Sequence, residues 1–173
     1  MGESDGTSGS AASSGADSSP PGSFAGEAPR VDFYVIEGAA AGARLKVACR
    51  LAEKAYLASQ RALIWHTDRT ELQALDELLW TFADGSFVPH DWLTSNGDEG
   101  VQAPVLLSAG APPAERFDFV INLAADPPPF LHLTRRIAEI VDGDVWSRRA
   151  GRVRFKAYRE LGIGPATHTL RAE

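Results

Sequence analysis

The run VDFYVI at Val31–Ile36 decides the fold class, because it is almost continuously apolar and rich in β-branched and aromatic residues. Such a run is typical of a strand that is covered on both faces. A turn rich in glycine and alanine follows at residues 38–42, and apolar residues then recur at helical spacing from Leu45 to about Gln60. The run ALIWH at Ala62–His66 is a second buried strand. A strand, a helix and a strand in this order predict a parallel α/β unit.

The rest of the chain continues this alternation. Asp68 and Glu71 form a pair like a capping box, which opens a helix that ends near Phe82. Further strands are expected at Phe87–Val88, Val105–Leu107 and Phe117–Leu123, and residues 137–141 fit either a strand or the end of a helix that begins near Phe130. Asp144 caps a last helix, and Gly162 lies at its end. The fold class expected is α/β, with a mostly parallel sheet and helices on both faces.

Composition divides the chain into a tail and one domain. Residues 1–30 are dominated by Gly, Ser, Ala and Pro, so they bury too little apolar surface to offset the entropy of ordering, and we expect a disordered, acidic tail. Residues 31–173 are expected to form a single α/β domain, with a polar surface loop at residues 94–102.

Bulk properties limit the class of protein. Cys49 is the only cysteine, so the chain forms no internal disulfide and no cysteine-rich metal site. No stretch approaches the roughly 20 apolar residues that span a bilayer, and the amino terminus lacks the pattern of a signal peptide. We therefore expect a cytoplasmic protein with no membrane partner.

The segment Asp144–Leu161 has a charge opposite to the rest of the chain. It carries +4, although the whole protein carries −6. On a helical wheel, one face holds Trp146, Ala150, Val153, Ala157 and Leu161, which we expect to be buried. The opposite face holds Arg148, Arg152, Phe155, Lys156 and Arg159. Cations around an aromatic ring fit an anionic, partly apolar ligand.

Three interpretations of that second face remain open. It fits a single-stranded nucleic acid with a base stacked on the ring, an acidic peptide with a hydrophobic end, or a basic helix face that only meets solvent. The negative charge of the whole chain opposes DNA at long range and so favours the peptide.

The sequence predicts no catalytic site, metal or cofactor. The turn from Gly38 to Gly42 lacks the spacing, the lysine and the hydroxyl of a P-loop, and it does not match the dinucleotide motif. His66 follows a strand and could pair with Asp68, but no recognisable nucleophile accompanies them. Cys49 lies on the inner stripe of a helix and is expected to pack.

Four aromatic residues gather near the end of the second helix. Trp80 and Phe82 lie at the helix end, and Phe87 and Trp92 lie in the loop that follows. Either Trp80 and Phe87 seal the core, or the group forms an apolar patch for another protein, since aromatic residues are enriched at interface hot spots.

Three motifs together resemble a known family. They are VDFY at Val31–Tyr34, LDELLW at Leu75–Trp80 with SFVPH at Ser86–His90, and FKAYR at Phe155–Arg159. In this order they are similar to the chi subunit of bacterial DNA polymerase III, from about Arg30 to the end of the chain. The resemblance implies a Rossmann-like fold without a working nucleotide site. It also implies a non-catalytic accessory subunit of the replicase, associated with the clamp loader.

The resemblance further implies partners. Chi proteins bind the acidic, phenylalanine-terminated tail of single-stranded DNA-binding protein, and they bind the psi subunit or a competing helicase, so contact with DNA is mainly indirect. By matching motif, Arg152, Phe155 and Lys156 fall on the tail-binding positions, and Trp80 and Phe87 fall on the psi or helicase surface. Arg148 and Arg159 are added from the helical wheel alone. Direct binding of single-stranded nucleic acid and an adaptor role for a DNA-repair helicase are the alternatives.

Two residues depart from the family pattern. Phe155 stands where the family commonly has Tyr or Trp, so the ring has no polar group for the tail. Gly151 lies inside the last helix, where glycine costs about 1 kcal/mol relative to alanine.

Overall fold

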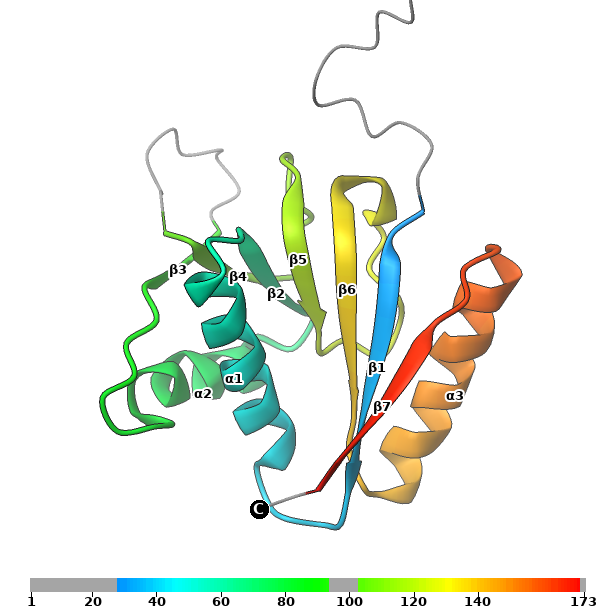
Figure 1. Ribbon diagram of the computed structural model, residues 1–173, viewed down its shortest axis with the longest axis horizontal. Coiled ribbons are helices and arrows are strands. Elements are labelled where there is room, and N and C mark those ends of the chain that lie inside the picture. Colours follow the sequence, from blue (N-terminus) through cyan, green and yellow to red (C-terminus); the bar gives the residue numbers. More distant parts are fainter. Residues whose placement is uncertain (1–27, 94–102, 172–173) are drawn as a thin grey trace, which may run out of the picture.

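The computed structural model describes residues 28–93 and 103–171, which form one β-sheet with three α-helices packed on it (Figure 1). The strands are β1 (Arg30–Glu37), β2 (Ala62–His66), β3 (His90–Trp92), β4 (Val105–Ala109), β5 (Phe117–Asn122), β6 (Thr134–Val141) and β7 (Ala166–Arg171). The α-helices are α1 (Ala43–Leu57), α2 (Arg69–Thr81) and α3 (Val145–Glu160), and a 3-10 turn covers Leu131–Leu133.

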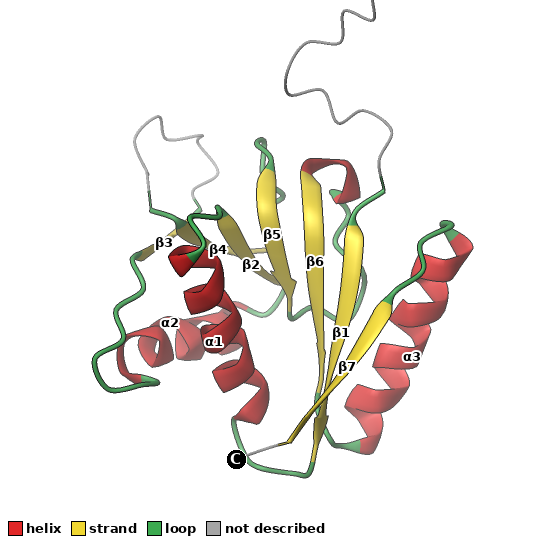
Figure 2. Cartoon of the chain, in the orientation of Figure 1, coloured by secondary structure: helices red, strands yellow, loops and turns green. Residues whose placement is uncertain are grey.

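The strands pair in the order β3-β4-β2-β5-β6-β1-β7, and every described pair is parallel. Helices α1 and α2 lie on one side of the sheet and α3 lies on the other (Figure 2). The expected fold class is therefore confirmed. This arrangement buries both faces of the central strands, which explains why β2 and β4 read as continuous apolar runs.

Two layers of core hold the helices to the sheet. On the first side, Leu72, Leu75 and Leu79 of α2 are fully buried at helical spacing, and the inner face of α1 packs in the same cluster. On the second side, the rings of Phe33 on β1 and Tyr158 on α3 pack edge to face within the core.

Several elements differ from the sequence prediction or complete it. The predicted strand at Phe87–Val88 is wrong, because β3 begins only at His90, after a proline that has no N–H to donate. Residues 137–141, left open by the sequence, belong to strand β6. Strand β7 was not predicted at all. The loop expected at 94–102 and most of the tail expected at 1–30 lie outside the described residues.

A buried polar network ties α3 to the sheet. The Glu139 carboxylate on β6 accepts hydrogen bonds from Arg154 Nε (2.8 Å), Tyr158 Oη (2.6 Å) and Asn122 Nδ2 (2.8 Å). Glu139 and Tyr158 are fully buried, and Arg154 is almost so. Burial raises the pKa of Glu139, although the Arg154 charge and the three hydrogen bonds oppose that rise. We name these four residues the Glu139 network.

A second polar cluster covers the sheet beside α1, over β1, β6 and β7. The buried Asp32 carboxylate accepts from Arg136 Nε at 2.8 Å and pairs with His168 Nε2 at 2.9 Å, and the Tyr34 ring stacks on His168. Burial alone raises the pKa of Asp32, but the hydrogen bonds from His168 and Arg136 and the charges of Arg136 and Arg30 outweigh burial. The pKa of Asp32 is therefore lowered.

We predict that Arg154→Met destabilises the protein by about 3–5 kcal/mol, because it leaves the Glu139 carboxylate buried without its counter-charge. Urea unfolding followed by circular dichroism measures this free energy. Arg152→Met is the matched control, since Arg152 is exposed on the same helix, and its change should stay within about 0.5 kcal/mol. Equal, small losses in both variants would contradict the stabilising role of the Glu139 network.

We predict that Asp32→Asn lowers stability at neutral pH and that the loss shrinks in acid. The native pKa of Asp32 lies below its unfolded value of about 3.9, so the stabilisation is complete above that pH and disappears as the pH falls through the native pKa. Unfolding of both proteins in urea from about pH 7 to about pH 3 measures the difference. A difference that stays constant over this range is the contradicting result.

Candidate functional site

Helix α3 has well-defined ends. The Asp144 side chain accepts from Ser147 N at 2.8 Å at the amino end, and Ser147 Oγ accepts from Asp142 N at 2.8 Å. At the carboxyl end, Gly162 has a φ of 81°, the left-handed conformation that commonly ends a helix. Both ends therefore fall where the sequence predicted them.

The rotation of α3 about its axis differs from the prediction. Trp146, Val153 and Leu161 were expected to be buried, but they are 77%, 64% and 60% exposed. The residues that face the sheet are Gly151, Arg154 and Tyr158. The wheel was wrong because it ranked residues by hydrophobicity, whereas the polar groups of Arg154 and Tyr158 are buried against Glu139.

A hollow of about 190 Å³ opens between α3 and the sheet edge at β7. Its lining consists of Phe33, Val35, Val141, Arg148, Gly151, Arg152, Phe155 and Thr167. We name it the α3–β7 hollow. It is smaller than the pockets of about 300–1,000 Å³ that hold drug-sized ligands, so its size suits one or two side chains.

Phe155 forms part of the floor of this hollow. Its ring lies 5.2 Å from the Phe33 ring, tilted by 57°, and the side chain is half-buried. The ring is therefore not on the outward cationic face where the helical wheel places it. Because it packs against Phe33 and is half-buried, only part of it is open to a ligand.

Gly151 is explained by the same packing. A Cβ atom at Gly151 would lie 2.7 Å from Val141 Cγ2, closer than carbon atoms approach. The helix can therefore lie against β6 only with glycine at this position. Glycine makes the helix itself less stable, but at this position it allows close packing beside the hollow.

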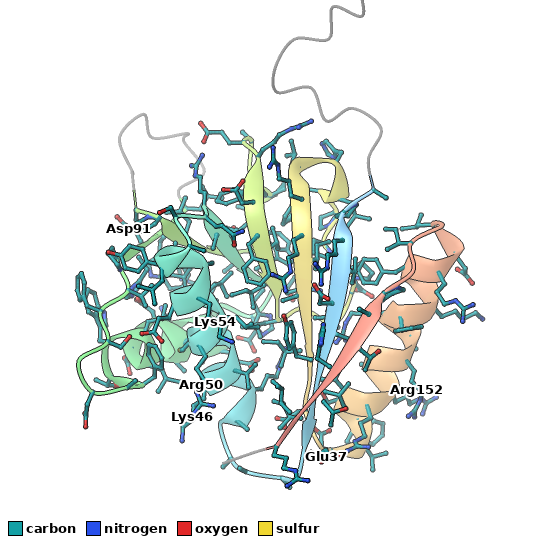
Figure 3. The ribbon with its side chains drawn as sticks, viewed as in Figure 1. Glu37, Lys46, Arg50, Lys54, Asp91 and Arg152 are labelled. Carbon is teal, nitrogen blue, oxygen red and sulfur yellow. The ribbon has the colours of Figure 1, made fainter. Side chains whose placement is uncertain are left out.

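Four cations lie at or next to the hollow. Arg148 and Arg152 line it, and Lys156 and Arg159 line an adjoining surface pocket that shares Arg152 and Phe155 with the hollow and also contains Glu160. All four are exposed, and Arg152 extends from α3 away from the sheet (Figure 3). Within the described part of the chain, the only ion pair among them joins Lys156 to Glu160 at 4.0 Å. Both side chains of that pair are largely exposed, so solvent weakens it and leaves Lys156 available.

The second predicted surface is an exposed aromatic pair. Trp80 is 53% exposed and Phe87 is 61% exposed, and their ring centroids lie 5.5 Å apart. Phe82 and Trp92, the other two aromatics of the group, pack against the core. The alternative that Trp80 and Phe87 seal the core is therefore wrong, and these two rings form an exposed apolar patch.

Asp76 holds this aromatic pair in place. Its carboxylate pairs with His90 Nε2 at 2.7 Å and accepts from Trp92 Nε1 at 3.1 Å, and the His90 ring lies 4.6 Å from that of Trp80. Ser86 Oγ donates to Glu53 on α1 at 2.6 Å. In the sequence, Asp76, Ser86 and His90 stand out only as parts of the family motif, and that shared motif is the one signal of their positioning role.

Two loops are in contact at the carboxyl edge of the sheet, the edge at which nucleotides bind in open α/β folds. The loop after β1 contacts the loop after β6 so closely that a Cβ at Gly143 would lie 1.8 Å from the Gly38 carbonyl oxygen. His66 Nε2 pairs with the Glu71 carboxylate at 2.6 Å, whereas Asp68 contributes only its backbone N–H, which donates to His66 Nδ1 at 3.2 Å. Arg44 binds both Glu71 and the Leu123 carbonyl. These side chains fasten α1 and α2 to the strand ends.

The remaining candidates are structural. Cys49 is fully buried in the core, and burial raises the pKa of its thiol to about 12. In residues 28–93 and 103–171, no group of three or more His, Cys, Asp or Glu side chains is placed to hold a metal ion. None of the described helices combines the length and apolar character needed to cross a membrane.

Comparison with known proteins gives the family. A model of the family described as "DNA polymerase III chi subunit, HolC" matches residues 29–166. The chain belongs to the DNA polymerase III chi subunit family. It is 41% identical to DNA polymerase III subunit chi of Pseudomonas aeruginosa over 141 residues, which cover 82% of this chain and 96% of that protein. The subunit of the same name from Escherichia coli is 30% identical over 125 residues, 72% of this chain and 84% of the relative.

A solved structure supports the fold alone. The crystal structure of T4 UvsW matches with a TM-score of 0.58 at 9% sequence identity, and the match covers 83% of this chain and 42% of that one. It is the family match over residues 29–166, together with the relatives above, that confirms the resemblance noted from the three motifs. The Trp80–Phe87 pair and every residue of the α3–β7 hollow except Thr167 lie within the matched residues.

Proposed function

We propose that this protein is a non-catalytic accessory subunit that binds the acidic tail of single-stranded DNA-binding protein through the α3–β7 hollow. By the same proposal, the protein joins the clamp loader of the cytoplasmic replicase to DNA that is coated with single-stranded DNA-binding protein. The observation that carries the proposal is an apolar hollow lined by Arg148 and Arg152, next to a surface pocket that adds the exposed cations Lys156 and Arg159.

The chemistry of the hollow matches a phenylalanine-terminated acidic tail. A phenyl side chain can enter between Phe155 and Thr167 and bury its apolar surface against Phe33. The terminal carboxylate and the preceding aspartates then lie among Arg148, Arg152 and Lys156, where charge-assisted hydrogen bonds form. An apolar end and an acidic body are thus recognised by two adjoining parts of one site.

Size and exposure set the expected strength. The hollow is small and its cations are exposed, so we expect micromolar affinity, on the order of −8 kcal/mol. Much of this energy comes from charges in solvent, so binding weakens as salt rises toward about 1 M, where the Debye length falls to about 3 Å.

Direct binding of single-stranded nucleic acid fits less well. A stacked base needs an open ring face, whereas Phe155 is half-buried against Phe33. The chain as a whole carries −6, which repels a polyanion at long range. A short peptide meets only the local cations and is less affected by the distant acidic groups.

The Trp80–Phe87 pair supports a second contact. Its two rings are exposed next to each other and are fixed from below by His90 and Asp76, as expected for a preformed hot spot. We propose that this pair binds the psi subunit or a DNA-repair helicase. Because it lies on α2 and the following loop, away from α3, both contacts can form at once.

We predict that Arg152→Glu and Lys156→Glu each weaken binding of a synthetic acidic peptide ending in Phe by at least about tenfold, because each removes a charge-assisted hydrogen bond and adds repulsion. Calorimetry on the full chain measures the dissociation constant. Arg149→Glu is the matched control, since it makes the same charge change on α3 outside the hollow, and it should leave binding nearly unchanged. Equal losses in all three variants, or tighter binding of a single-stranded oligonucleotide than of the peptide, would overturn the assignment.

We predict that Trp80→Ala with Phe87→Ala weakens binding of the second partner by about thirtyfold, the loss typical of removing a hot spot of about 2 kcal/mol. The psi subunit and the helicase of the same organism are each tested by surface plasmon resonance. Leu57→Ala, which removes an equally exposed apolar side chain from α1, is the control and should have no effect. Retained binding of both partners by the double variant is the contradicting outcome.

A further inference from the structure

An apolar stripe runs along the solvent side of α3. It consists of Trp146, Ala150, Val153, Ala157 and Leu161, and we name it the α3 stripe. Its three large members are between 60% and 77% exposed, and its two alanines are half-buried. A helix normally turns such a row toward the core, so a row left in solvent marks a place for another molecule.

The α3 stripe is separate from the α3–β7 hollow. None of its five residues lines the hollow or the cationic surface next to it. The two features lie on opposite flanks of the helix, because the Glu139 network directs Arg154 and Tyr158 toward the sheet between them. A ligand of the hollow therefore leaves the stripe uncovered, and the stripe needs an occupant of its own.

The shape of the stripe fits an α-helix. Its residues follow at intervals of four, three, four and four positions, and large side chains alternate with alanine. This pattern makes a straight row of knobs and holes about 22 Å long, as in a coiled-coil seam. An extended segment or loop would bring unpaired backbone groups to an apolar surface, whereas a helix satisfies its own.

The charges beside the stripe define the partner further. Arg149 and Lys156 border its outer side and are exposed. Arg149 makes no ion pair with any other residue that the structure describes, and Lys156 has only the weak contact with Glu160. Carboxylates on the flank of an incoming helix would pair with both cations, as charged residues at the edge of a coiled-coil seam do.

A second copy of the chain fits poorly. In an antiparallel pair of α3 helices, each flank meets the same flank of the other copy, so Arg149 and Lys156 would face their own counterparts. Like charges at such positions destabilise a seam rather than close it. The occupant must therefore differ in sequence from α3.

We propose that the α3 stripe is a docking site for an amphipathic helix of a second protein, with carboxylates along the flank that meets Arg149 and Lys156. The five stripe residues and Arg149 are separate from the hollow, whereas Lys156 is shared with the cationic surface beside it. It gives α3 two faces for two partners, one that recognises an acidic peptide end and one that recognises a helix.

The test uses a fluorescent three-heptad peptide, helical in isolation, with Leu at the seam and Glu at the flanking positions. Fluorescence anisotropy with the full chain should show binding about tenfold tighter than that of the same peptide with Lys at the flanks. Val153→Glu and Trp146→Ser should each weaken binding of the Glu peptide by about tenfold, whereas Arg152→Glu should leave it unchanged. Circular dichroism verifies that each variant is folded; both substituted residues are exposed, so folding is expected to survive.

Three results would overturn the proposal. They are absence of binding to the unmodified protein, unchanged binding in both Val153→Glu and Trp146→Ser, and preference for the Lys peptide. Sedimentation of the protein alone provides one more contradicting result: if the protein is a dimer and Val153→Glu dissociates it, a second copy of the chain is the occupant. A monomer at all concentrations, together with loss of peptide binding in the stripe variants, supports the helix-docking site.

Discussion

The buried carboxylate of Glu139 sets the orientation of α3, and the binding surfaces depend on that orientation. Three donors reach this carboxylate, and two of them, Arg154 and Tyr158, belong to α3 and lie on one side of the helix. A buried charge must be paired, and no small rotation of α3 keeps both contacts. The network therefore fixes the rotation of α3 about its own axis, which apolar packing alone would leave less well defined.

That single rotation has consequences on both flanks of the helix. On one flank it brings Phe155 against Phe33 and leaves the cations around a small hollow at the edge of the sheet. On the other it leaves Trp146 and Val153 in solvent. The sheet contributes the remaining constraint, because Gly151 must lie against Val141 for the helix to approach. At the carboxyl edge of the sheet, where nucleotides bind in open α/β folds, Gly38 and Gly143 bring the loops after β1 and β6 into contact.

Most of the sheet could be predicted from sequence, because strands buried on both faces are continuous apolar runs; Ala62–His66 was placed to the residue. Strand β7 could not be found this way, since it is an edge strand of polar, mostly exposed residues that pairs only with β1. The rotation of α3 was missed for a related reason. Hydrophobicity does not reveal that Arg154 and Tyr158 will be buried, because their partner Glu139 lies 15 and 19 residues away in the chain. The candidate residues of the hollow came from a family motif, and their grouping at one hollow emerged only in three dimensions.

The exposure of Val153 in solution tests this account most directly. Cys49 is fully buried, so a cysteine introduced by Val153→Cys is the only thiol expected to react in the folded protein. If the Glu139 network orients α3 as described, this thiol reacts with an aromatic disulfide reagent as fast as a cysteine in a short peptide. A thiol that stays protected until the protein unfolds would place Val153 in the core and would contradict the orientation on which both binding surfaces depend.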